Sequence, residues 1–482
     1  MKIGEKHSTG VLFCLILVII FSLFLAGCMV GPDYVRPEIK APAAYVYEDK
    51  DARDTANTEW WKQFQDPVLD AMIAEALANN KNIKVAAANV EQAAALLVQT
   101  RAPLFPQLGY SGSGTRERAS ESAATPIPAG TPNPQTAYQV LASASWEIDL
   151  WGRIRRLSEA AQANLFASEE ARRGVILSLV ASVASDYIQL LGLDEQLVIS
   201  KRSLATYAES VRLFELQLKY GQVSQMNVEQ ARTQYETAAA TIPQIESQIA
   251  QTENALSVLL GRNPGQIPRG KTITSLNPPA VPAGLPSDLL VNRPDIRQAE
   301  QELVAANAQI GAAKALYYPT ISLTGAFGFA SSDLANLFKG PARAWSYAGS
   351  FTGPIFSGGA ISGQVRQAEA GRKAALLNYE LSVQNGFADV ESALVARRKL
   401  VEQLQAQERL VRASSEYVRL AQMQYNGGYS PYSTVLQAEQ QLFPAELNYA
   451  QYRASLLTSL VNIYKAMGGG WVTGAERMTN GD

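Results

Sequence analysis

Hydrophobic and polar residues alternate strictly from Tyr138 to Leu150, and the pattern then changes to a helical spacing that continues to Lys219. The alternation predicts a strand with one apolar and one polar face. The segment Trp151-Gly152-Arg153 follows it, and the next proline is Pro243. A helix of roughly 65 residues is about 100 Å long, which exceeds what a globular domain needs. The apolar positions of the strand are Val140, Ala142, Ala144, Trp146, Ile148 and Leu150.

The same order of elements occurs twice along the chain. A helix over 68–101 and a strand over 107–114 precede the first unit, and a helix over 293–314 precedes the second. In the second unit, residues 320–329 and 345–356 alternate, and a proline-free helical run extends from Gly358-Gly359 to Ser430. A constant offset between the copies indicates one internal duplication. Matching pairs are Ile148 with Ile355, Gly152 with Gly359, Ala161 with Ala368, Gly221 with Gly428, Ala231 with Ala438 and Gly261 with Gly468.

Each long run predicts a helical hairpin. Glycine is the usual C-terminal breaker of a helix, so Tyr220-Gly221 and Gly427-Gly428 are predicted to end the two outgoing helices. The chain then returns over 223–260 and 431–467, where Pro243 and Pro444 are expected to bend the helices.

The N-terminus has the features of a bacterial export signal. Two lysines precede an apolar run over 11–25, which ends in Leu25-Ala26-Gly27-Cys28. This sequence resembles a lipobox, whose cysteine becomes the lipidated N-terminus of the mature chain, so we expect lipid on Cys28. Met29 rather than Asp at the next position favours sorting to the outer membrane. The alternative is an uncleaved anchor with an incidental cysteine.

Composition excludes several kinds of chemistry. The chain has 482 residues and a net charge of −2, which gives no indication of nucleic-acid binding. Its only histidine is His7, and its two cysteines are Cys14 and Cys28, all within or next to the signal. A Ser-His-Asp triad or a site of clustered His and Cys ligands is therefore absent from the mature sequence. We therefore expect that the protein is not an enzyme and that it holds no metal and no cofactor other than the covalent lipid.

These boundaries divide the chain into six expected segments. They are a signal peptide (1–27), a lipidated extended segment (28–67), a first repeat of a helix, two strands and a long helical hairpin (68–261), a linker (262–286), a second repeat (287–468) and a C-terminal tail (469–482).

Strand length and polarity favour a membrane location. Each predicted strand has about ten residues and one apolar face, which is typical of transmembrane β-strands. Four strands cannot close a barrel, and open edges are not tolerated in lipid. Other chains must therefore complete the sheet, with eight strands in a dimer or twelve in a trimer. The competing interpretation, a soluble helical bundle with incidental strands, leaves the lipobox and the duplication unexplained.

One combination of motifs along the chain is specific: Cys28, Val30-Gly31-Pro32-Asp33-Tyr34, Pro37, Asp149-Leu150-Trp151-Gly152-Arg153, Asn292-Arg293-Pro294-Asp295-Ile296, Tyr318-Pro319 and Gly468-Gly469-Gly470-Trp471. In these residues the chain resembles TolC-type outer-membrane factors, in the lipoprotein branch called the NodT family. The resemblance implies a mainly α fold with a membrane β-barrel portion: a homotrimer forming a 12-stranded barrel and a periplasmic α-barrel in the outer membrane of a Gram-negative bacterium. It also implies a periplasmic adaptor and an inner-membrane pump, usually of the RND class, which expels drugs or other small molecules through this passive duct. The alternative function is a periplasmic coiled-coil adaptor or structural lipoprotein.

Three groups of residues are candidate sites. Trp151, Gly152 and Arg153 are expected at the membrane–periplasm boundary, because tryptophan favours interfaces. The motif Glu-x-Val-Arg-Leu occurs near both hairpin turns, at 209–213 and 416–420. It is a candidate periplasmic gate, or alternatively a set of ordinary i,i+3 ion pairs. The turns themselves are expected to dock the adaptor. The gate candidates are Glu209, Arg212, Glu416, Arg419 and Leu420, and the docking candidates are Tyr220, Gly221, Gln222, Gly428 and Tyr429.

Overall fold

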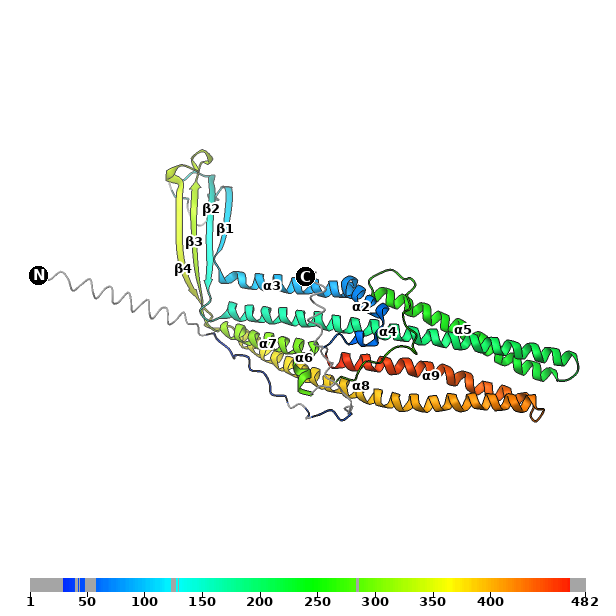
Figure 1. Ribbon diagram of the computed structural model, residues 1–482. Coiled ribbons are helices and arrows are strands. Elements are labelled where there is room, and N and C mark those ends of the chain that lie inside the picture. Colours follow the sequence, from blue (N-terminus) through cyan, green and yellow to red (C-terminus); the bar gives the residue numbers. More distant parts are fainter. Residues whose placement is uncertain are drawn as a thin grey trace. The chain divides into compact units, whose positions relative to one another are not determined.

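The structure is a computed structural model that describes residues 29–39, 42, 44–47, 58–122, 127–128, 130–282 and 286–468. The expected signal peptide, Cys28 and the C-terminal tail lie outside these residues. The described part is mainly helical, as expected, and Figure 1 shows long helices together with a four-stranded sheet. Contacts divide the described residues into two compact units: those within Met1–Glu38, Val90–Ala167 and Ala299–Tyr379 form the first, and those within Ile39–Asn89, Ser168–Gln298 and Glu380–Asp482 form the second.

The first unit contains the sheet. Strands β1 (Gln107–Glu117), β2 (Gln135–Ile148), β3 (Thr320–Ser331) and β4 (Arg343–Thr352) pair antiparallel in the order β1-β2-β3-β4. The β2–β3 pair joins the two repeats, with Val140 opposite Phe329. In the same unit, alanines of α4 (Arg153–Lys219) pack against alanines of α7 (Pro294–Ala315), where small side chains allow close approach of the helices.

The second unit contains most of two helical hairpins, whose outgoing helices enter it at Ser168 and Glu380. The first is α4 with α5 (Gln225–Leu259), and the second is α8 (Ala360–Asn426) with α9 (Ser433–Ala466) (Figure 1). The main core lies around the middle of α4, where Tyr187 and Val180 are fully buried. Trp60, in the 3-10 helix η1 (Trp60–Phe64), stacks on Tyr464 of α9 with ring centroids 5.3 Å apart, so η1 is fixed against α9.

Most element boundaries agree with the sequence pattern, and one expectation was wrong. The single helix predicted over 68–101 is broken at Asn80 into α2 (Pro67–Asn79) and α3 (Lys81–Arg101). Asn80 leaves the helical conformation because its side chain forms hydrogen bonds both to α5 and to the start of α3. Its Nδ2 donates to the Leu259 carbonyl at 2.8 Å, and its Oδ1 accepts from the Asn82 amide at 2.8 Å. Strand β4 ends four residues earlier than predicted. Helices α5 and α9 continue through Pro243 and Pro444, and the bends expected there stay a prediction.

Among the helices of the described residues, α4 alone is long and apolar enough to cross a membrane by length and composition. Most of its apolar stretch is buried inside the structure, which is the usual environment of a core helix.

Candidate functional site

The sheet exposes an apolar face rich in aromatic side chains. The register places the apolar residues of neighbouring strands directly opposite one another, such as Phe327 between Ala142 and Trp345. Trp345 and Tyr347 are 68% and 81% exposed, and their rings stack at 5.8 Å. A water-soluble sheet would cover such a face, so this face requires an apolar environment. Its exposed members are Leu108, Tyr110, Val140, Trp146, Leu323, Phe327, Trp345, Tyr347 and Phe351.

The opposite face of the same sheet is polar. Because side chains alternate along a strand, the residues between the apolar ones share this face. Ser322 and Ser350 lie opposite each other there, with their hydroxyl oxygens 2.6 Å apart. A sheet with one apolar and one polar face suits a wall between lipid and water. Polar members are Gln139, Ser143, Ser145, Glu147, Ser322, Thr324, Ser346 and Ser350.

The segment between β2 and α4 is built as a fixed junction. Asp149 caps α4, because its carboxylate accepts from the amides of Ile154 and Arg155 at 3.0 and 2.8 Å. Trp151 stacks on Tyr318 at 4.6 Å, and its indole N–H donates to the Pro319 carbonyl at 2.8 Å. These contacts tie the start of α4 to the segment that precedes β3.

The other two boundary candidates also have defined roles in this junction. Arg153 pairs with Glu147, the last polar residue of β2, through contacts of 2.8 and 2.9 Å. Gly152 has φ of +78°, and a Cβ there would lie 2.7 Å from Met29 Cγ. Glycine is therefore required both by the backbone conformation and by the approach of the N-terminal residues.

Residues Met29–Pro37, here called the N-terminal strap, are held against α4 and α7 by a series of fitted contacts. Gly31 lies against Gly311, where an added Cβ on Gly31 would come within 2.4 Å of the Gly311 Cα. The buried Arg156 reaches Asp33 at 2.8 Å and also the carbonyls of Val30 and Gly31. The strap therefore fixes Met29, the residue after Cys28, beside Gly152.

The strap continues along α7. Asn307 donates to the Pro32 carbonyl at 2.9 Å. Further along, Glu300 accepts from Tyr34 at 3.3 Å and pairs with Arg36 at 2.9 Å. The sequence motif Val30–Tyr34 thus has a structural role that its extended pattern did not reveal.

The gate candidates form ion pairs within their own helices. Arg212 contacts Glu209 at 2.9 Å, and Arg419 contacts Glu416 at 2.7 Å, both with i,i+3 spacing. All four side chains are more than half exposed, and Leu420 is 40% exposed. The hydrogen bond from Arg419 lowers the pKa of the Glu416 carboxyl. The geometry matches the interpretation of ordinary i,i+3 ion pairs on an exposed helix surface.

The two hairpin turns share one backbone motif. Gly221 and Gly428 have φ of +70° and +76°, and each follows the end of an outgoing helix. In both turns the glycine amide and the next amide bond back to helix carbonyls: Gln222 to Gln217 and Tyr429 to Gln424, each at 2.9 Å. These are Schellman motifs, so the glycines have a clear structural function. The neighbouring Tyr220 and Tyr429 are 70% and 88% exposed.

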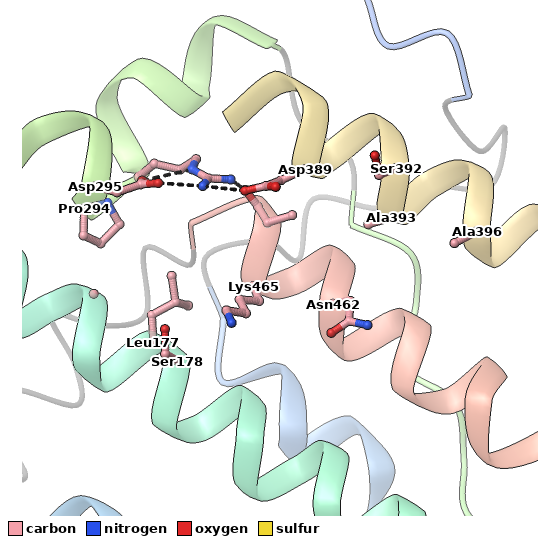
Figure 2. Close-up of a pocket in the computed structure, with 13 residues that line it drawn as sticks. Leu177, Ser178, Pro294, Asp295, Asp389, Ser392, Ala393, Ala396, Asn462 and Lys465 are labelled. Atoms are coloured by element: carbon pink, nitrogen blue, oxygen red, sulfur yellow. Dashed lines mark hydrogen bonds and ion pairs between the residues drawn. The ribbon is translucent and has the colours of Figure 1, made fainter. Parts of the chain in front are cut away.

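Arg293 belongs to the Asn-Arg-Pro-Asp-Ile motif and links the start of α7 to α8 and to the end of α9. Its buried guanidinium contacts Asp295 at 2.7 Å and Asp389 at 2.9 Å, and it donates to the Ala466 carbonyl at 2.8 Å. These residues border a cavity of about 470 Å³. Figure 2 shows Asp295 and Asp389 facing each other there, with Lys465 on α9. The first repeat has a neutral counterpart, because Asn80 bonds the Leu259 carbonyl in the same manner.

Known proteins resemble this chain over nearly its whole length. Its sequence matches the outer membrane efflux protein family over residues 72–262 and 285–469. The solvent efflux pump outer membrane protein SrpC of Pseudomonas putida is 38% identical over 93% of this chain and 97% of its own. The cation efflux system protein CusC of Escherichia coli is 35% identical over 95% and 99% of the two chains. The open-state MtrE outer membrane channel of Neisseria gonorrhoeae has a TM-score of 0.84 and 32% identity, and the match covers 92% of this chain and 99% of that one.

The family match spans both helical hairpins and the sheet described above. This chain belongs to the outer membrane efflux protein family.

Proposed function

We propose that this protein is the outer-membrane channel of a tripartite efflux pump, a passive exit duct for drugs or other small molecules. The observation that carries the proposal is the four-stranded sheet with an exposed aromatic face, a polar opposite face and two unpaired edge strands, β1 and β4. Unsatisfied backbone edges are costly in lipid, so the sheet needs partner strands. Three copies supply twelve strands, and the polar faces then line the pore.

The proposed location of the sheet can be tested by charge substitution. Phe327→Arg places a cation in the middle of the apolar face, where lipid contact costs about 2–4 kcal/mol. Ser143→Arg is the matched control, because it adds the same charge on the polar face of the same sheet. We expect the first variant to reduce the heat-modifiable trimer in outer-membrane fractions and the second to leave it unchanged. Equal effects of the two variants would contradict the proposed orientation.

We infer that lipid on Cys28 anchors the chain beside the junction. Support comes from the N-terminal strap, which holds the adjacent Met29 against Gly152 near Trp151. Metabolic labelling with palmitate tests this step, since Cys28→Ser should abolish the label. Labelling that persists in this variant would exclude Cys28 as the lipidated residue.

The two other components of the pump are a periplasmic adaptor and an inner-membrane transporter, which we propose to be of the RND class. The exposed turns at Tyr220–Gln222 and Gly428–Tyr429 are the proposed adaptor contacts, because aromatic area is common in such interfaces. Bulky substitutions at Gln222 and Tyr429 should weaken crosslinking to the adaptor and lower drug resistance. Unchanged crosslinking and resistance would refute the docking site.

We propose that Glu416 and Leu420 form the periplasmic constriction. Arg419, which pairs with Glu416, and the corresponding pair Glu209–Arg212 of the first repeat are further gate candidates. Three copies of Glu416 would make a ring of carboxylates, which favours cations. Single-channel recording of Glu416→Ala and Leu420→Ala tests this assignment. Wild-type conductance and ion selectivity in both variants would remove these residues from the gate.

A deletion strain profiled against drugs, solvents and metals tests the whole proposal. Loss of resistance to at least one class, restored by the intact gene, is the expected result. Periplasmic fractionation without trimer would instead favour an adaptor or structural lipoprotein.

A further inference from the structure

Glu439 lies in a position that a glutamate rarely occupies. It sits on α9 with a relative exposure of 8%, and its Oε2 has no hydrogen-bond partner within the described part of the chain. A buried carboxylate without a partner is costly, and most buried polar groups in native structures are satisfied. A binding partner from outside the chain would remove the cost of burying this carboxylate.

The carboxyl group borders a cavity of about 150 Å³ between helices of the second unit. This volume is roughly ten times the ~10–15 Å³ that holds one water molecule, so a small organic group fits. The cavity is lined by hydroxyl groups from α4 and apolar side chains from α8 and α9. Its lining comprises Arg202, Ser203, Thr206, Tyr207, Val418, Glu439, Leu442, Phe443 and Glu446.

Arg202, the one basic residue of the described lining, is already paired. Arg202 contacts Glu446 at 2.6 Å at a more exposed part of the cavity. The hydroxyl of Tyr207 donates to the backbone carbonyl of Glu439 at 3.4 Å, so that bond does not satisfy the carboxylate. Among the described lining residues, Arg202 is therefore neutralised by Glu446, and the Glu439 carboxylate has no positive group paired with it.

The first repeat shows that the fold does not require this arrangement. The register that pairs Ala231 with Ala438 places Arg232 at the position of Glu439. Arg232 is about half exposed and pairs with Glu215 at 2.9 Å. One hairpin therefore carries a paired surface cation where the other carries a buried and unpaired acid. This difference points to a role specific to the second hairpin.

We propose that this cavity binds the ammonium group of a small organic cation, with the Glu439 carboxylate as its counter-ion. The rings of Tyr207 and Phe443 pack edge to face, 6.3 Å apart, and aromatic rings beside a carboxylate suit an organic ammonium through cation–π attraction. A hard metal ion needs several oxygen ligands, and the described residues contain no cluster of three or more His, Cys, Asp or Glu side chains. The site does not depend on the proposed channel function.

The experiment measures binding of n-butylammonium to the purified full-length protein in detergent, by saturation-transfer difference NMR at pH 8.5 in an amine-free buffer. Burial raises the pKa of Glu439 to about 7, so the carboxylate is ionised at this pH. We expect n-butylammonium to bind the wild-type protein, and Glu439→Gln to bind it at least tenfold more weakly. The neutral probe 1-butanol should bind both proteins weakly and equally.

Glu229→Gln is the matched control, because it removes one acidic group from the exposed surface of α5 without changing the cavity. It should bind n-butylammonium as the wild type does. Equal binding by Glu439→Gln, or equal binding of 1-butanol and n-butylammonium to the wild type, would overturn the proposal. Displacement of the probe by millimolar Mg²⁺ in the wild type alone would also overturn it, since the cavity would then be a metal site.

Discussion

Replacing Glu439 with glutamine should stabilise the protein in a strongly pH-dependent way. Burial raises the pKa of this carboxyl from 4.5 to about 7 in the folded state. A shift of one unit corresponds to 1.36 kcal/mol, so ionised Glu439 costs about 3 kcal/mol at pH 8.5. Glutamine keeps the shape of the side chain and has no charge to desolvate.

The sign of the pH dependence follows from proton binding. Between pH 4.5 and pH 7 the folded state holds the Glu439 proton more tightly than the unfolded state does, so stability falls as the pH rises. Below pH 4.5 the carboxyl is protonated in both states and contributes nothing. The advantage of Glu439→Gln should therefore be near zero at pH 4.5 and reach its full value above pH 7.

Urea unfolding followed by helical circular dichroism, in detergent and amine-free buffer, measures this difference. Wild type and Glu439→Gln are compared at pH 4.5, 6 and 8.5, and Glu229→Gln controls for the loss of a surface charge. If the gap between wild type and Glu439→Gln were the same at all three values, desolvation of the carboxylate would not be its cause.

Other contacts give predictions of similar precision. Asp149→Ala removes the cap of α4 and should cost about 0.5–2 kcal/mol in urea unfolding, whereas an unchanged midpoint would show that the cap is dispensable. Gly311→Ala would place a Cβ 2.6 Å from the Val30 carbonyl oxygen, so the N-terminal strap should loosen by about 1–3 kcal/mol and be cleaved faster in limited proteolysis. Gly363→Ala, with open space around it, is the control, and equal cleavage of the two variants would refute the steric argument. Gly428→Ala should cost about 1 kcal/mol because of its positive φ, and a thermal midpoint no lower than that of Gly363→Ala would argue against it.

The sequence predicted the strands and long helices because their signals are local. Alternation revealed the strand around Val140, and glycine at 221 and 428 marked the turns. The break at Asn80 was missed because neither glycine nor proline marks it. It depends on the Leu259 carbonyl, 179 residues away in the chain.

Long-range partners also explain what the sequence did not reveal about the sites. Glu439 lies in a glutamine-rich helical stretch and has the pattern of a surface residue, and its burial depends on the packing of α4. The partner of Arg293, Asp389, is 96 residues away. The internal duplication carries a signal for the unusual position of Glu439, because it pairs this acid with the basic Arg232.

The register between β2 and β3 has a consequence for the order of folding during synthesis. The β1–β2 and β3–β4 hairpins each form within one repeat, but Ile148 must meet Ile321 across the whole α4–α5 hairpin. Closing a flexible loop about ten times longer than that between β1 and β2 costs about 2 kcal/mol more. Packing of the α7 alanines against those near the start of α4 removes part of this cost, because it returns the chain to the end of β2. The contact between α4 and α7 thus acts as an intramolecular template for the sheet, and the aromatic face is complete only after β4 has been translated, because Trp345 and Tyr347 belong to it.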